Sequence, residues 1–146
     1  MKTRTAAAWL LAFATFSVSA FAQDADPAAL VKAAQATVQQ IDEGRASAVW
    51  DAMSAAVKQR VSRKDFVDAT TRSRQAMGTP GARYWVTVSR QQAQGTASIP
   101  AGMYSSVEFE SLVASGKTVR ELISFRFDED KIWRASGYTL RADDAR

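Results

Sequence analysis

Three glutamates in the second half of the chain are the side chains best suited to acid–base chemistry. Glu108 and Glu110 stand two residues apart within the stretch SIPAGMYSSVEFES, and Glu121 follows in the next apolar stretch. Residues i and i+2 of a strand share a face at roughly 6.5–7 Å, between the carboxylate separations of retaining and inverting glycosidases. The spacing therefore admits a hydrolase that acts on sugars through carboxylates.

Other catalytic chemistries are excluded by residue types that the sequence lacks. The chain contains no histidine, no cysteine and no asparagine. Ser-His-Asp and Cys-His catalysis, the usual zinc ligand sets, disulfides and N-linked glycans are therefore ruled out. Neither a P-loop nor a GxGxxG sequence occurs. The sequence predicts neither a cofactor nor a metal site.

The alternation of side chains favours a structural role for the acidic pair. Glu108 and Glu110 share one face of a strand, and Val107 and Phe109 occupy the other face. Matching apolar residues across the next strand predicts the register, because a slip by one residue turns a core set outward. The expected pairs are Val107 with Phe125, Phe109 with Ile123, and Ala114 with Thr118.

In this register, two arginines stand diagonally across from the acidic pair. Arg120 is within reach of Glu110, and Arg126 is within reach of Glu108. An arginine neighbour lowers the pKa of a carboxyl group, whereas a general acid at neutral pH needs a raised pKa. We therefore interpret the pair as the charged face of a strand. Glu121 differs because alternation points it toward the core, where a carboxylate is functional or paired with an arginine.

The same alternation predicts a contact surface on the solvent face of the sheet. Helices can cover only one side, so an apolar-aromatic patch rimmed by arginine and glutamate would suit binding of another molecule. The alternative is that the C-terminal tail or the long loop at residues 93–102 covers it. The expected patch, for a last hairpin loop of three residues, consists of Trp85, Tyr104, Leu112, Leu122 and Tyr138.

A second binding hypothesis places a small molecule between the helices and the sheet. A fold in which helices cover one face of a sheet can hold a ligand between the two layers. Aromatic residues at helical spacing form a packed core more often than a pocket, so a filled interior is the competing interpretation. The residues expected to line the pocket are Trp50, Phe66, Phe109 and Trp133.

The elements that must position these residues are helices in the first half of the chain and strands in the second half. Apolar residues recur every three or four positions over residues 27–43, 47–57 and 62–77. The period then falls to two over residues 83–92, 103–113, 118–127 and 132–141. We expect an α+β fold in which three N-terminal helices pack on one face of a four-stranded antiparallel meander sheet, by analogy a cystatin-like or NTF2-like cone.

The first 22 residues are typical of a secretory signal. Lys2 and Arg4 precede an apolar run, and Ala20-Phe21-Ala22 is a small-x-small cleavage sequence. Residues 23–146 then form one domain. It carries the 17 basic residues left after removal of Lys2 and Arg4, against 15 acidic ones. No other apolar stretch has the length of a membrane span, so we expect a soluble periplasmic protein.

A run of basic residues raises the question of nucleic-acid binding. Asp65 and Asp68 interrupt the run, and Lys64 stands at i,i+4 spacing from Asp68. We therefore interpret the run as a solvated helix face and expect no nucleic-acid partner. The basic residues are Lys58, Arg60, Arg63, Lys64, Arg72 and Arg74.

The order of several short motifs resembles a known family. The stretch DEGRASAVWDAMSAAVKQRVSRKDFVDATTRSRQAMG, with IPAGMYSSVEFES and ELISFRFDEDKIWRASGYTL, is similar to a bacterial secreted family with no assigned activity, number 4019 among the domains of unknown function. The resemblance covers about residues 28–141. The chain departs from the family in its glutamine-rich loop and at Phe66, where tryptophan is expected. The resemblance implies a fold and an exported location but no reaction, so no functional residues are carried over.

These observations predict a non-catalytic exported interaction or ligand-binding domain. Its partner is expected to be an unidentified protein or small ligand. The small-molecule pocket and the carboxylate hydrolase are the alternatives, and each requires side chains to converge in a cavity or cleft.

Overall fold

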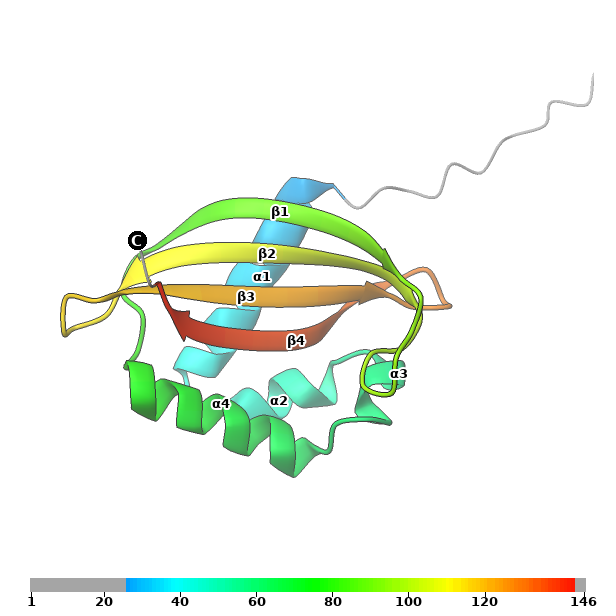
Figure 1. Ribbon diagram of the computed structural model, residues 1–146, viewed down its shortest axis with the longest axis horizontal. Coiled ribbons are helices and arrows are strands. Elements are labelled where there is room, and N and C mark those ends of the chain that lie inside the picture. The colour runs from blue at the N-terminus through cyan, green and yellow to red at the C-terminus, as the bar shows by residue number, and fades with distance from the viewer. Residues whose placement is uncertain (1–25, 144–146) are drawn as a thin grey trace, which may run out of the picture.

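The computed structural model describes residues 26–143 as four helical segments followed by four strands (Figure 1). The expected signal peptide, residues 1–22, lies outside the described residues. In the described part of the chain, no helix is long and apolar enough to cross a membrane. The helices are α1 (Pro27–Asp42), α2 (Ala46–Asp51), α3 (Ala55–Lys58) and α4 (Arg63–Met77). The strands are β1 (Arg83–Ala93), β2 (Gly102–Leu112), β3 (Thr118–Phe127) and β4 (Trp133–Ala142).

The predicted α+β fold with a four-stranded antiparallel sheet is confirmed. The strands are hydrogen-bonded in chain order β1-β2-β3-β4, because each connection is short enough to return the chain antiparallel to its neighbour. In Figure 1, α1 crosses the strands diagonally behind the sheet, whereas α2 and α4 gather beside β4. Leu30, Ala34 and Val38 of α1 pack against Val107 and Ile123 at the centre of the sheet.

The prediction of three helices is not confirmed, because the second predicted helix is broken in two. Ser54, between α2 and α3, is buried and turned toward the sheet. Its backbone N–H donates to the carbonyl of Ala135 in β4 over 2.9 Å, and its hydroxyl donates to Asp128 over 2.6 Å. These bonds to the sheet replace the next hydrogen bond that a continuous helix would make.

The register between β2 and β3 differs from the prediction by two residues. Val107 stands opposite Ile123, and Phe109 stands opposite Glu121. A shift of two residues leaves every side chain on its expected face. The difference arises in the hairpin, whose turn lies one residue earlier in the chain than the predicted pair of Ala114 with Thr118 requires. There, the backbone N–H of Val113 donates to the carbonyl of Lys117 over 3.0 Å.

Two β-bulges change which side chains face the helices. In β1, Trp85 stands opposite Phe109 and Thr87 stands opposite Glu108, so Val86 is the extra residue. In β4, Ala135 and Gly137 have consecutive partners in β3, so Ser136 is the extra residue. Each bulge reverses the in-out alternation along its strand, because two residues oppose one.

Candidate binding groove

The five residues of the predicted outer patch do not form one surface. Trp85 lies on the helix side of the sheet, since its partner Phe109 is a core residue. Tyr138 also lies on the helix side, opposite the fully buried Ile123. The predicted outward direction of Trp85 and Tyr138 is therefore wrong. It was wrong at Tyr138 because the bulge at Ser136 reverses the alternation of that strand, whereas the change from a three-residue to a five-residue loop before β4 shifts the register by two and keeps the faces.

The other three patch residues lie on the solvent side but differ in exposure. Tyr104 is buried, because the loop between β1 and β2 covers it and its hydroxyl donates to the carbonyl of Pro100 over 2.8 Å. The long loop therefore covers part of this face, as the alternative interpretation held. Leu122 is half-buried, and Leu112 is 60% exposed at the far end of the sheet.

The acidic pair is bridged by one central arginine. Arg120 lies 3.1 Å from Glu108 and 2.8 Å from Glu110, and it also pairs with Asp143 over 3.1 Å. The predicted pair of Glu108 with Arg126 is wrong, because the two-residue change of register moves Arg120 between the two glutamates. The arrangement is a charged network on the face of the sheet, as the interpretation of a structural pair requires.

Glu121 is buried on the opposite face of the sheet, at 1% exposure. The carboxylate of Glu121 accepts hydrogen bonds from two arginines and a tyrosine. Arg74 Nη2 donates over 3.0 Å, the Tyr138 hydroxyl donates over 2.8 Å, and Arg83 donates through Nε. Both arginines also pair with Asp42, each over 2.7 Å. Burial, reinforced by the charge of Glu121, raises the pKa of Tyr138 well above its ordinary value. Of the two alternatives for a buried carboxylate, a functional group or a partner of arginine, Glu121 is therefore the second.

The three glutamates do not converge on a cleft. Glu108 and Glu110 lie on the solvent face, whereas Glu121 points into the helix side. Across residues 26–143, no group of three or more acidic side chains is placed to hold a metal ion.

The four aromatic residues of the predicted pocket belong to two separate clusters. Phe109 and Trp133 pack with α1 and the centre of the sheet. Phe66 and Trp50 pack with α2, α3 and α4. Phe109 and Phe66 are both buried. These four side chains therefore contribute to packed core, and none of them lines the groove described below.

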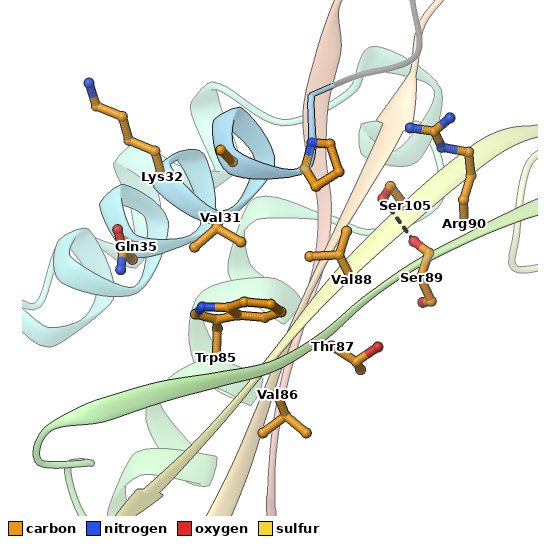
Figure 2. A pocket seen from close by; sticks show the side chains of 12 residues that line it. Val31, Lys32, Gln35, Trp85, Val86, Thr87, Val88, Ser89, Arg90 and Ser105 are labelled. Atoms are coloured by element: carbon orange, nitrogen blue, oxygen red, sulfur yellow. Dashed lines mark hydrogen bonds between the residues drawn. The ribbon is translucent and has the colours of Figure 1, made fainter.

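The structure instead forms a groove between α1 and β1, with a volume of about 1100 Å³. Figure 2 shows the indole of Trp85 pointing from β1 toward Val31 of α1, with Val88 beside it on the same side of the strand. Val31 and Val88 also pack against the main core cluster. The floor of the groove is therefore a continuation of the core that the helix leaves uncovered.

The groove is open because α1 uses a different stripe of residues to contact the sheet. Leu30, Ala34 and Val38 are buried at helical spacing, which commits that stripe to the core. A neighbouring stripe at i, i+3, i+4 and i+7 borders β1 and remains partly exposed. Its members are Ala28, Val31, Lys32 and Gln35. This second stripe was the signal in the sequence that could have located the groove.

The rim of the groove is polar and carries basic side chains. Lys32 and Arg90 line it, and no carboxylate is among the lining residues within 26–143. The guanidinium of Arg90 also lies over the ring of Trp133, 5.8 Å from its centroid. The hydroxyl of Ser105 donates to the carbonyl of Ser89 over 2.8 Å, as the dashed line in Figure 2 marks. An apolar floor with a cationic rim suits a ligand that combines apolar and anionic parts.

Comparison with known proteins identifies the family of the chain. Among solved structures, the 1.8 Å structure of Aln2 from a Streptomyces species is similar, with a TM-score of 0.46 and 10% identity, covering 82% of this chain and 93% of that chain. No curated protein matches. The family model described as "Protein of unknown function (DUF4019)" matches residues 33–138, from within α1 to within β4. The chain therefore belongs to the DUF4019 family, as its sequence motifs indicate.

Proposed function

We propose that this protein is a non-catalytic exported binding domain whose binding site is the groove between α1 and β1. Trp85 is the observation that carries the proposal. Its ring is 60% exposed, yet it lies in a concave surface and faces Val31 of the opposite wall (Figure 2). Exposed tryptophan in a concave setting is typical of binding sites, because it buries a large apolar area on contact.

The polar groups of the groove support recognition rather than catalysis. They are a lysine, an arginine, a glutamine and hydroxyl groups, and none of the three candidate glutamates lies among them. A hydrolase would need carboxylates or another acid–base pair around the reacting bond. The groove offers instead an apolar floor and donors that fix the orientation of an anionic group.

Two further considerations agree with the proposal. Cone-like folds of the cystatin or NTF2 type hold ligands between helices and sheet, which is an argument by analogy. The first 22 residues have the sequence of a secretory signal, which supports a periplasmic location. A small apolar molecule with an anionic group remains the alternative to a protein partner.

The dye 8-anilinonaphthalene-1-sulfonate tests the groove, because it combines an aromatic body with a sulfonate. We expect saturable binding with a rise in fluorescence for the protein comprising residues 23–146. Trp85→Ala should weaken this binding by about tenfold or more, as expected for a central aromatic contact.

Tyr84→Ala is the matched control for this experiment. Tyr84 precedes Trp85 in β1, is 72% exposed, and stands opposite Glu110 on the other face of the sheet. Its replacement should leave dye binding unchanged. Equal loss of binding in the two variants, or none in Trp85→Ala, would place the dye elsewhere and refute the groove as the binding site.

A further inference from the structure

We propose that the groove takes an extended peptide segment with acidic residues, which pairs with the outer edge of β1 as a fifth strand of the sheet. This inference rests on the proposed function and adds the class of partner. Three features support it: the edge position of β1, the position of α1 and the charge of the rim.

β1 is an edge strand of eleven residues with one unpaired side. It forms a ladder with β2 along its length. Within residues 26–143, no strand pairs with its other side. Backbone N–H and C=O groups on that side are therefore available to a partner chain, the arrangement used in β-augmentation. A small apolar ligand would leave these backbone groups unused.

The middle of β1 carries few of the features that normally prevent edge pairing. Residues 84–89 read YWVTVS and contain no charged residue, proline or glycine. Aromatic and β-branched residues favour pairing in a pleated sheet. The bulge at Val86 is the one protective device in this stretch. Arg83 precedes the stretch but turns inward to Asp42 and Glu121.

The helix above the groove gives a fifth strand a second surface to contact. Figure 1 shows the first turns of α1 extending past β1, beyond the edge of the sheet. A strand beside β1 would place every second side chain on the helix side. Those side chains would lie in the groove, where they would contact Trp85 and Val88 of β1 and Val31 of α1. Apolar residues at alternate positions of the partner would fill the groove.

The rim charge selects an acidic partner over a second copy of this chain. Lys32 is an exposed cation on the rim, and the described lining residues include no carboxylate. In a symmetric contact between two copies, each molecule presents the same surface, so these residues of one copy would offer no carboxylate to Lys32 of the other. A peptide with glutamate or aspartate supplies the complementary charge.

Fluorescein-labelled synthetic peptides test the partner class in fluorescence anisotropy titrations. The probe is a blocked peptide of alternating valine and threonine that ends in a pair of glutamates, and its sister ends in a pair of lysines. We expect the glutamate peptide to bind about tenfold tighter than the lysine peptide. Lys32→Glu should abolish this preference. Lys117→Glu, in the exposed hairpin between β2 and β3, should preserve it.

N-methylated peptides test whether the backbone pairs. Alternate amides of a strand point to the same edge, so methylation of alternate nitrogens blocks one edge at a time. One methylated series should lose binding and the complementary series should keep it. Equal binding of both series would mean that side chains alone dock, and the fifth strand would be wrong.

The outcomes separate this inference from the proposed function. Binding of the dye at Trp85 without binding of either peptide would overturn the fifth strand and leave the groove as a binding site. Loss of both would overturn the two proposals together. Sedimentation at increasing protein concentration should show a monomer. A dimer that Trp85→Ala dissociates would assign the edge to a second copy and overturn the acidic peptide.

Discussion

Trp85 and Tyr138 occupy opposite ends of the helix side of the sheet, and their surroundings differ. Tyr138 lies beneath the helices beside β4, where its hydroxyl binds Glu121 and its ring lies 5.6 Å from the guanidinium carbon of Arg74. Trp85 lies on the edge strand, where, within residues 26–143, the flank of α1 alone stands above it. The same side of one sheet is therefore closed at β4 and open at β1.

The difference teaches that facing the helices is not the same as being buried. A large side chain is buried only where neighbouring elements surround it on every side. The β4 end has that cover from α2 and α4, and the space there is filled by an ion-pair network around Glu121. Among the described residues, the β1 end lacks this cover, and its tryptophan remains 60% exposed.

The largest expected effect is at the closed end. Glu121→Ala removes the buried carboxylate that Arg74 and Arg83 share and leaves these two partly buried cations with Asp42 as their remaining carboxylate partner. Breaking a buried ion pair in this way costs about 3–5 kcal/mol of unfolding free energy. Urea unfolding followed by circular dichroism measures the loss. If Glu121→Ala does not fold, the isosteric Glu121→Gln provides the measurement.

Glu110→Ala is the matched control for this prediction. Glu110 pairs with Arg120 on the exposed face, where an ion pair contributes about 0–1 kcal/mol. A similar loss at the two glutamates would show that the buried network is no more important for stability than the surface one.

Removal of the aromatic ring at the closed end should have the next largest effect. Tyr138 packs against all three core clusters. Tyr138→Ala should lower the free energy of unfolding by about 3 kcal/mol, because it opens a cavity and removes the donor to Glu121. Tyr138→Phe isolates the hydroxyl, which donates to a charged acceptor, and should cost about 1.5–3 kcal/mol. If both variants were as stable as the wild-type protein, Tyr138 would not be packed in the core beside β4.

The same change at the open end should have a small effect on stability. Trp85→Ala should alter the free energy of unfolding by less than about 1 kcal/mol, since the ring is mostly exposed. Its dye binding should nevertheless fall. A large destabilisation here would identify Trp85 as a core residue and remove the contrast between the two ends. Thermal unfolding of the two alanine variants side by side gives the comparison.

The smallest expected effect concerns the exposed carboxylate of Glu129, which pairs with the buried Arg126 at the end of β3. Hydrogen bonding to Arg126 lowers the pKa of Glu129 below its ordinary value of 4.5. The group is charged in the folded protein at pH values where it is already protonated in the unfolded chain. Its contribution to stability is therefore present above pH 4.5 and is lost as the pH falls through the folded pKa.

A carboxyl-detected NMR titration measures this pKa directly. Arg126→Gln should return the titration midpoint of Glu129 toward 4.5. The difference in unfolding midpoint between wild type and Glu129→Gln should shrink as the solution becomes more acidic. A Glu129 midpoint at or above the ordinary value in the wild-type protein would contradict the pairing.

The parts of the fold that the sequence predicts well depend on local patterns. The four strands lie within one residue of the predicted ranges, since period-two alternation and short turns are local signals. Ser62 caps α4 as its position indicates, with its hydroxyl accepting from the backbone N–H of Asp65 over 3.1 Å. The inward direction of Glu121 also followed from alternation, and pairing with arginine was one of the two alternatives open to a buried carboxylate.

The parts that failed depend on contacts between distant segments. The break at Ser54 is caused by Ala135 and Asp128, which lie more than seventy positions away in the chain. A strand alternation counted from the sequence cannot include a bulge, because the extra residue is defined only by the partner strand. Trp85 and Tyr138 were misplaced because their burial depends on this pairing and on which helix covers each end of the sheet.

By itself, the sequence determined the class of fold, the family and the chemistry that is excluded, because composition and local periodicity are properties of the chain alone. It also predicted the apolar stripe of α1 at Leu30, Ala34 and Val38. Only the tertiary structure decided that this stripe meets the sheet and that the neighbouring stripe of α1 borders an open groove. The physical reason is that burial is a relation between surfaces, and the surfaces that face each other are fixed only once register, bulges and helix position are set.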